Sequence, residues 1–377
     1  MRGPVWDGLW ILNALWLAPL AWFLARGLED PERGPLDGLY LLLTALFWVG
    51  HRISSTWLAY FTTAYRPLLR AQPVRFVVMP ALVAATLFVL LLPPDDALPF
   101  TRSERVMGLV ILDYLLVTYH FAAQHFGVLS LYRSRAGRVA SRAERRADRL
   151  FALGVGGLAI VVAEALRGDV FFQDVWVDPW LDPGWLSSAE DRVRVAATAV
   201  LVLAVVAMLV REARTPRPSV ARALYAVGLG GMATLAVLAE QPFLFLFLWT
   251  VQHWLVAVGL ATLVARGEPE PGRGGLVRWI HGVNRRPLLL VAVLAVLSVL
   301  LLPVMEVEAI DEGAVAYGDR LFPAFARALR ESSWVPALIA LGFTTAFCHY
   351  LLDRAVYRFS DPDVRRAAAG LTKGRSA

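Results

Sequence analysis

Long apolar runs, separated by short charged segments, constrain this chain more than any other feature of its sequence. Hydrophobic residues make up 58% of the 377 positions and charged residues only 18%, an apolar share well above that of a water-soluble domain. In a bilayer the backbone polar groups must bond within their own segment, so runs of this length predict transmembrane helices. We therefore predict an all-α, polytopic transmembrane helix bundle of about ten spans. These spans are residues 6–26, 36–65, 74–93, 105–131, 150–167, 194–211, 220–239, 242–265, 287–305 and 334–357.

Arginines and acidic residues fall in alternate segments between the predicted spans. Because arginine-rich short loops stay on the cytoplasmic side, this bias places both termini in the cytoplasm. It also accounts for the net charge of +6 without a nucleic acid partner. Residues 1–359 would form a single bundle in a bacterial inner membrane, and residues 360–377 a basic cytoplasmic tail. The basic segments are 66–75, 132–149, 211–222, 266–286 and the tail; the acidic segments are 27–35, 94–104, 168–193 and 306–333, the last two expected to form surface or re-entrant caps.

Five of the six histidines lie within predicted spans, and four of them share one depth. Each of the four falls about 11 to 15 residues from the predicted outer end of its span, or about 16–23 Å at 1.5 Å per residue. Titratable groups in hydrocarbon are costly without partners and indicate a functional site. Four imidazoles at one level of a helix bundle supply the donors that a metal centre needs. The predicted metal ligands are His51, His120, His253 and His349.

Polar residues on the same helix faces are candidates to support these histidines. Asp353 follows His349 by four residues, so the two side chains share a helix face. We include Asp353 among the metal-binding candidates, with the expectation that it orients the imidazole; Asp113 is the alternative for that role. The candidates for positioning a substrate or O2 are Tyr119, Gln124 and Tyr350.

The two remaining histidines, His125 and His281, lie outside this set of four. His125 follows His120 by five residues, which places it about 140° round an ideal helix. It joins the same metal centre only if the helix loosens, for instance near Gly127; otherwise it faces a second site or a neighbouring helix. His281 lies in a basic loop and is expected to be solvated.

Several cofactors match this set of side chains. Neutral imidazoles with one carboxylate suit iron, copper or zinc. The H-E-x-x-H helix of zinc peptidases and the H-x-x-x-H and H-x-x-H-H boxes of fatty-acid desaturases are not present in the sequence. Haem b held by two histidines is the main alternative, because histidines at one depth permit a single haem. They do not suit a relay of stacked haems across the bilayer.

The layout of the intramembrane histidines resembles that of the Brp/Blh-type membrane carotene oxygenases. The resemblance rests on the four predicted ligands and on the sequence H-F-G at residues 125–127. It implies a helical bundle in which histidines from several spans hold a non-haem iron and a lipid-soluble polyene is cleaved. The P-H-G-x-x-D-H pattern of that family is not present here. What the resemblance implies for this chain is therefore a histidine-ligated iron beside an apolar cavity.

The sequence as a whole favours a membrane-embedded, metal-dependent oxidoreductase. We expect a non-haem iron oxygenase or desaturase that acts on a lipid-like substrate reached from the surrounding membrane lipids, with a redox partner as electron source. One alternative is a haem b-binding electron-transfer protein. Another is a transporter that uses the histidines as a proton relay. Transporters ordinarily show broken helices or paired repeats, and neither stands out in the sequence.

The ten-span arrangement predicts a definite pattern of reporter activity. Fusions after residues 30, 100, 180 and 320 should report an outside location, and fusions after residues 140 and 275 an inside location, because arginine-rich segments remain cytoplasmic. Paired alkaline phosphatase and fluorescent-protein fusions measure the two states. An inside location for the segment 168–193 would contradict the arrangement.

Overall fold

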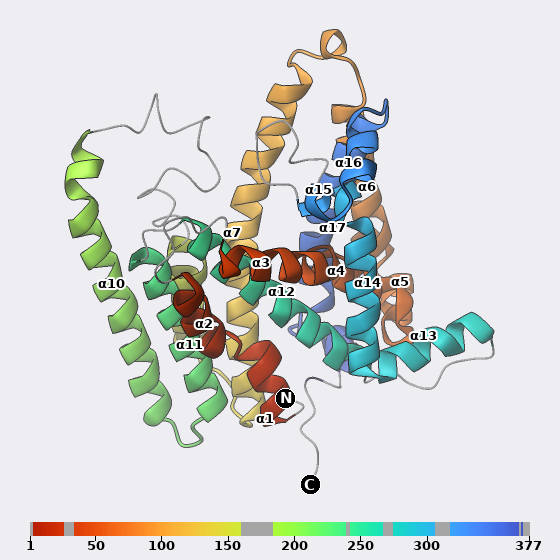
Figure 1. Ribbon diagram of the computed structural model, residues 1–377. Coiled ribbons are helices and arrows are strands. Elements are labelled where there is room, and N and C mark those ends of the chain that lie inside the picture. Colours follow the sequence, from red (N-terminus) through yellow and green to blue (C-terminus); the bar gives the residue numbers. More distant parts are fainter. Residues whose placement is uncertain are drawn as a thin grey trace. The chain divides into compact units, whose positions relative to one another are not determined.

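The computed structural model describes residues 3–25, 34–159, 184–238, 242–266, 274–305, 317–368 and 371 (Figure 1). This part of the chain is all-helical, with 87% helix and no strand, which confirms the all-α part of the predicted fold class. The long apolar helices are compatible with an integral membrane protein.

The chain divides into two compact units, which are described separately below. Unit 1 consists of Met1–Tyr40 and Thr118–Val256, and unit 2 consists essentially of Leu41–Val117 and Ala257–Arg375. Two long helices, α7 (Arg102–Arg135) and α12 (Pro242–Arg266), contribute residues to both units. The prediction of one bundle over residues 1–359 stays a prediction.

Among the described residues, seven helices are long and apolar enough to cross a membrane, and each coincides with one of the ten predicted spans. The number of spans and the location of the termini stay predictions. The seven candidate spans are Val74–Leu91, Arg102–Arg135, Asp191–Ala213, Val220–Leu238, Leu244–Arg266, Pro287–Met305 and Val335–Val356.

The first predicted span, 6–26, is a broken helix. Pro4–Ile11 (α1 and the π-helical turn η1) and Ala14–Ala25 (α2) meet at an angle of 51°. At the break, the side-chain amide of Asn13 donates to the backbone carbonyls of Trp10 and Gln252, both at 3.1 Å. A helix that bends in an apolar environment must satisfy the carbonyls it releases, and Asn13 does so at this position.

Two further predicted spans differ from single continuous helices. The segment 36–65 consists mainly of α3 (Pro35–Leu43), the π-helical turn η3 (Thr44–Trp48) and α4 (Val49–Phe61), and it is not among the candidate spans. The segment 150–167 begins in α8 (Arg142–Leu153) and η7 (Gly154–Leu158), but its residues from 160 on lie outside the described part.

The expected outer caps are described only in part. Residues 168–183 lie outside the described residues, and from Gly184 on the chain is already in helix α10 (Gly184–Ala213). Residues 306–316 also lie outside, whereas the rest of that segment forms the short helices α15 (Tyr317–Leu321) and α16 (Pro323–Arg330).

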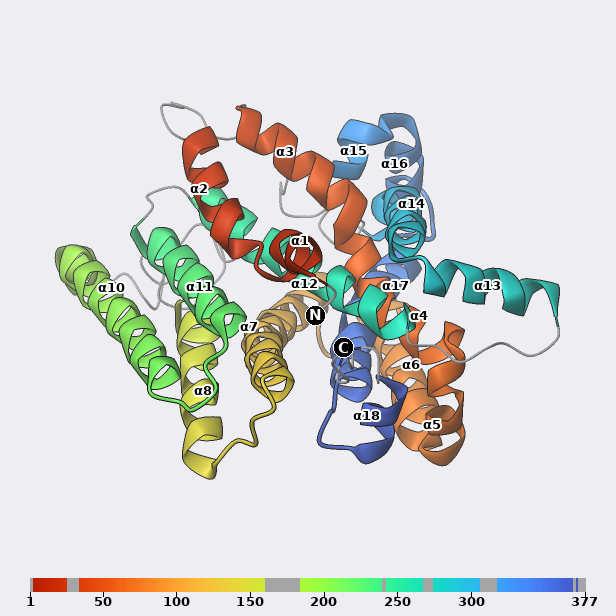
Figure 2. The ribbon, with the colours of Figure 1, turned by 90° about the horizontal axis from the view of Figure 1, so that it is seen from below.

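In unit 1, α10 and α11 (Val220–Leu238) lie side by side and antiparallel (Figures 1 and 2). Small residues on α11 allow this close packing. A Cβ on Gly230 would lie 2.0 Å from Cγ2 of Val205 on α10, so only glycine fits there. On another face of α11, Gly228 receives Ala14 and Leu15 at the start of α2.

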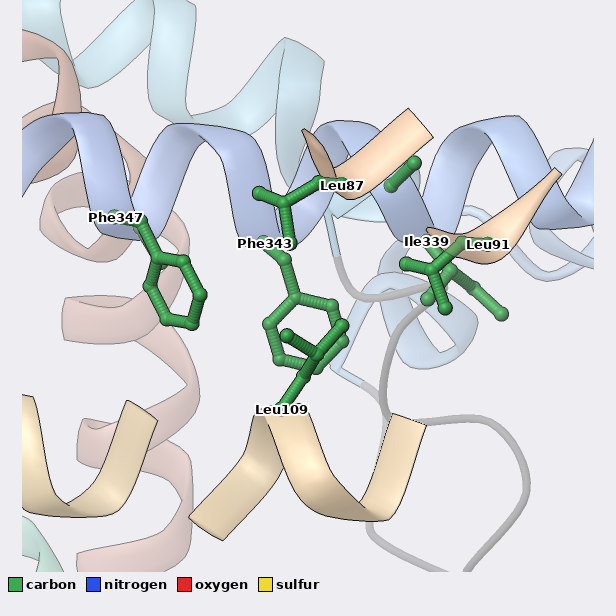
Figure 3. Packing of buried hydrophobic residues seen from close by; sticks show 8 residues of the cluster. Leu87, Leu91, Leu109, Ile339, Phe343 and Phe347 are labelled. Carbon is green, nitrogen blue, oxygen red and sulfur yellow. The ribbon is translucent and has the colours of Figure 1, made fainter. Parts of the chain in front are cut away.

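In unit 2, α17 (Val335–Val356) packs against α6 (Met79–Leu91) and against the first part of α7. Phe343 of α17 lies next to Leu87 of α6 and Leu109 of α7 in the cluster drawn in Figure 3, and Phe347 belongs to the same cluster further along α17. Full burial of side chains of this size stabilises such packing by about 1.5–3 kcal/mol each in water, and by less between helices in lipid. The remaining elements are η4 (Thr63–Tyr65), α5 (Arg66–Ala71), η5 (Val74–Val78), η6 (Asp95–Ala97), α13 (Gly275–Arg285), α14 (Pro287–Met305) and α18 (Pro362–Ala367).

The start of the predicted basic tail is an ordered helix of unit 2. Asp361 caps α18 by accepting from the backbone N–H groups of Asp363 and Val364. Val364 and Ala367 are buried, and the side-chain amide of Gln72 donates to Asp361 at 3.1 Å. Residues 369–370 and 372–377 of the tail lie outside the described residues.

A buried carboxylate ties together one end of the helices in unit 1. Asp148 of α8 is 0% exposed. It accepts from Arg133 at the end of α7 and from Arg222 at the start of α11, the latter at 2.5 Å. Arg211 near the end of α10 donates to the same carboxylate oxygen as Arg222, at 3.3 Å. Four helices therefore meet on one negative charge.

A second carboxylate extends this network to the connecting loops. Glu212 pairs with Arg222 and with Arg138, the latter at 2.8 Å, and accepts from the backbone N–H of Ser219 at 2.6 Å. Arg138 also pairs with Glu144. Glu144 is the N3 residue of a capping box in which Ser141 is the N-cap of α8. The backbone N–H of Ser141, together with its hydroxyl and Arg138, lowers the pKa of Glu144 to about 2.

Neutralising Asp148 should strongly destabilise unit 1. The variant Asp148→Asn leaves the buried Arg133 and Arg222 without their shared counter-charge, and breaking a buried pair from one side costs about 3–5 kcal/mol. Thermal or denaturant unfolding in detergent measures the loss. The control is Asp363→Asn, whose partner Arg366 is exposed, so its pair should contribute less than about 1 kcal/mol. Equal stability of the two variants would contradict the proposed role of Asp148.

Candidate metal-binding histidines

All five histidines predicted to lie in spans are buried. Their exposed fractions range from 1% to 8%, although each carries a polar ring. Four of them form two pairs of edge-to-face rings, one pair in each unit, and the fifth makes a separate contact. The pairs are His120 with His253 in unit 1 and His51 with His349 in unit 2.

The pair in unit 1 joins α7 to α12. The ring centres of His120 and His253 lie 4.8 Å apart with an interplanar angle of 80°, an edge-to-face arrangement. Phe121, the neighbour of His120, packs its ring 4.4 Å from that of His253. Two neutral imidazoles are therefore held together in an apolar, aromatic environment.

Gln124 fixes which nitrogen of His253 carries the proton. The amide nitrogen of Gln124 lies 3.4 Å from the backbone carbonyl of His253, to which it donates. The amide oxygen of Gln124 is thus the atom that faces Nδ1 of His253, at 2.7 Å. An amide oxygen only accepts, so Nδ1 carries the proton and Nε2 carries the lone pair with which an imidazole binds a metal.

The pair in unit 2 joins α4 to α17. The ring centres of His51 and His349 lie 4.8 Å apart at an interplanar angle of 85°, and a ligand nitrogen of each lies within 4.8 Å of the other. Gly50 brings α4 onto α14 beside His51, because a Cβ at this position would lie 2.9 Å from the carbonyl oxygen of Leu294.

His349 has polar partners at the same nitrogen as His253. Its Nδ1 lies 3.2 Å from Oγ of Ser55 and 3.7 Å from a carboxylate oxygen of Asp353. The hydroxyl of Ser55 also lies 3.5 Å from the carbonyl of Arg52. We assign its proton to that carbonyl, in which case its oxygen accepts from Nδ1 of His349 and the lone pair of His349 is on Nε2. Asp353 lies beside the imidazole, as its spacing of four residues predicts, with Ser55 as the nearer partner.

The two pairs share a geometry that suits neighbouring ligands of one small ion. Two nitrogens, each about 2.0–2.2 Å from an ion, lie at most about 4.4 Å apart, and a ligand nitrogen of His51 lies within 4.8 Å of one of His349. Axial imidazoles on opposite sides of a haem iron would instead hold their ring centres about 6 Å apart. Ring centres at 4.8 Å are too close for a porphyrin between the members of either pair.

His125 faces a neighbouring helix, one of the two alternatives that its position on α7 predicts. Its Nδ1 lies 3.0 Å from the hydroxyl of Tyr225 on α11. On its other side, a Cβ at Gly156 would lie 2.5 Å from Cδ2 of the ring, so the π-helical turn η7 needs glycine there. Gly127 does not loosen the helix, since α7 continues without a break to Arg135.

The other predicted site residues are placed differently from one another. Tyr350 donates to Asp113 at 3.0 Å within unit 2, so both side chains take part in one polar contact next to His349. Tyr119 is 56% exposed on α7. His281, expected in a solvated loop, is only 8% exposed in helix α13, so this expectation was wrong.

Two partners of the histidines were not identified from the sequence. Ser55 follows His51 by four residues and so shares its helix face, but its hydroxyl contacts His349 of another helix. Tyr225 gave one usable signal, because it is the only tyrosine in the segment 220–238, whose other residues are apolar apart from Arg222 and Thr234. Comparison with known proteins adds no further residue: no family model, no curated protein and no solved structure matches the chain.

Removing the acceptor at His253 should cost stability. In Gln124→Leu the buried Nδ1–H of His253 loses its partner, and an unsatisfied buried donor costs about 1–3 kcal/mol. Unfolding in detergent measures this loss. Tyr119→Phe on the same helix is the control and should change stability by less than about 0.5 kcal/mol, because its ring is exposed. A neutral Gln124→Leu would show that Gln124 does not hold the imidazole.

Proposed function

We propose that this protein is a membrane-embedded, metal-dependent oxidoreductase, a non-haem iron oxygenase or desaturase that acts on a lipid-like substrate. The observation that carries the proposal is the common chemistry of the two histidine pairs. In each pair one imidazole presents Nδ1 to a fixed acceptor, which leaves Nε2 as the metal-binding nitrogen.

The chain's own residues take two kinds of role in this proposal. The ligands are His51, His120, His253 and His349, as their common depth in the sequence predicts. Gln124 orients His253, and Ser55 with Asp353 orients His349, so that each ring keeps the correct tautomer and direction. Iron held by such nitrogens supplies the activation of O2. His125 lies outside this set because it faces Tyr225.

The surroundings of the histidines support an apolar substrate. Phe121 packs on His253, and the ring of Tyr350 lies 5.7 Å from that of His349. Three of the four histidines, His120, His253 and His349, lie on candidate membrane spans, so a substrate dissolved in the bilayer would reach them without crossing water. Burial also excludes water from the reacting groups, which limits side reactions. A bacterial inner membrane and a redox partner belong to this proposal.

One observation favours transport as the second candidate function. The helix pair Pro4–Ile11 and Ala14–Ala25 is a broken segment, and broken spans form the ion sites of many transporters. Asp7 in this segment is only 6% exposed. A transporter would move protons or a substrate into reconstituted vesicles without a bound redox metal, so flux assays and metal analysis separate the two functions.

Metal content of the purified protein tests the proposal directly. We expect stoichiometric iron by elemental analysis, without the Soret band that haem would give. The common depth of the histidines predicts one ion per chain; two ions would assign a separate ion to each pair. Purified, iron-supplemented protein that contains no first-row metal would sink the proposal.

Single substitutions then distinguish ligands from orienting residues. His349→Ala should lose the metal, whereas Asp353→Asn should weaken its binding by about 10–100-fold, the usual effect of losing an outer partner. His281→Ala is the matched control, because this histidine of α13 is also buried but is neither a proposed ligand nor a proposed orienting residue. Complete loss in Asp353→Asn would make Asp353 a ligand. Full retention in both variants would remove α17 from the site.

A further inference from the structure

Three candidate spans of unit 1 end at one level. Arg133 lies in the last turn of α7, Glu212 in the last turn of α10 and Arg222 in the first turn of α11, and Asp148 and Glu212 link these helix ends through buried ion pairs. Ends of membrane-spanning helices lie where hydrocarbon gives way to lipid headgroups. This end of unit 1 therefore lies at a membrane surface.

Positive charge at this level far exceeds the negative charge. Residues 133–149 contain seven arginines and two acidic residues, and residues 211–222 contain four arginines and one acidic residue. All three acidic side chains are engaged by four arginines with little or partial exposure: Arg133, Arg138, Arg211 and Arg222. The three acidic side chains of these two segments are therefore already paired with arginines within the fold.

Six exposed arginines remain around this network, and we call them the arginine surface. None of them forms an ion pair with an acidic side chain in the described part of the chain. Four lie on α8 and two in the loop between α10 and α11, and the ion pair of Arg138 with Glu212 holds the two segments together. The arginine surface consists of Arg142, Arg145, Arg146, Arg149, Arg214 and Arg217.

Exposed apolar side chains lie among these arginines. Val139 is 96% exposed, Val220 is 73% exposed and Leu150 is 59% exposed. Guanidinium groups interleaved with aliphatic side chains match the boundary between phosphate headgroups and acyl chains. Apolar side chains at this position would make no favourable contact with a free polar anion. The chemistry of this region thus fits a phospholipid better than a soluble anion.

We propose that the arginine surface binds the headgroups of anionic phospholipids. Arginine forms paired hydrogen bonds with phosphate oxygens, and clusters of four to eight basic residues at a helix end are typical of binding to anionic lipids. The buried network has a defined part in this site. It orders α8 and the loop after α10, so that the exposed arginines form a fixed surface.

Native mass spectrometry of the full-length protein tests this site. The probes are phosphatidylglycerol and, as the neutral lipid, phosphatidylcholine, at equal concentrations in detergent. We expect adducts of phosphatidylglycerol in preference to phosphatidylcholine, and we expect the triple variant R142Q/R145Q/R146Q to reduce them about tenfold or more. The three side chains are exposed, so the variant should keep the unfolding temperature of the original chain.

The control removes equal charge elsewhere. R278Q/R285Q/R286Q changes three exposed arginines in or next to α13 of unit 2 and should retain most of the lipid adducts. An equal loss in both triple variants would mean non-specific attraction by net charge and would overturn the proposal. Displacement of phosphatidylglycerol by equimolar inorganic phosphate would overturn it as well, because the site would then bind free anions. Neither result depends on the metal content of the protein.

Discussion

The carboxylate of Asp148 is the interaction on which the described helix ends of unit 1 depend. It is fully buried, and it compensates arginines from three other helices. An isolated charge in such a place would be strongly unfavourable, so the helices must keep the positions in which the charges meet. Apolar packing between helices in lipid is weakly directional, whereas this network accepts only one register of α7, α8, α10 and α11.

The need of buried polar groups for partners also explains why the imidazoles of the two histidine pairs are held in fixed orientations. A buried imidazole has one donor and one acceptor nitrogen, and each needs a defined environment. Gln124 accepts from His253, and Ser55 accepts from His349, so the proton sits on Nδ1 in both rings. If these positions only had to be filled, an apolar side chain of the same volume would fill them at a lower cost in free energy. The polar partners therefore select one tautomer of each imidazole. Close packing does not require a particular tautomer, whereas metal binding does.

The sequence predicts the features that depend on a single helix. Seven of the ten spans predicted from apolar runs coincide with long apolar helices of the described residues, and the spacing of four residues predicts that Asp353 lies beside His349. The angle of about 140° on an ideal helix explains why His125 faces away from His120 and contacts Tyr225 instead. In each case the geometry follows from the helical repeat and needs no knowledge of the neighbours.

Features that depend on a neighbouring helix were beyond the sequence. Gln124 lies one turn after His120, which suggests a partner for that residue, but its amide bonds to His253 of another helix. Ser55 likewise follows His51 by one turn and contacts His349. The break at Asn13 was also missed, because its stability depends on the carbonyl of Gln252. Hydropathy records the length of an apolar run but not the bonds that allow it to bend.

The long helix α7 connects the two chemical levels of unit 1. His120 and Arg133 are thirteen residues apart on this helix, about 20 Å along its axis. Between these two residues, His125 bonds to Tyr225 of α11. At Arg133 itself, Asp148 links α7 to the same helix, because Asp148 pairs with both Arg133 and Arg222. These two contacts fix both the rotation and the height of α7 against α11. Rotation decides whether His120 meets His253, so the ion network at the helix end helps to set the direction of an imidazole that lies far from it.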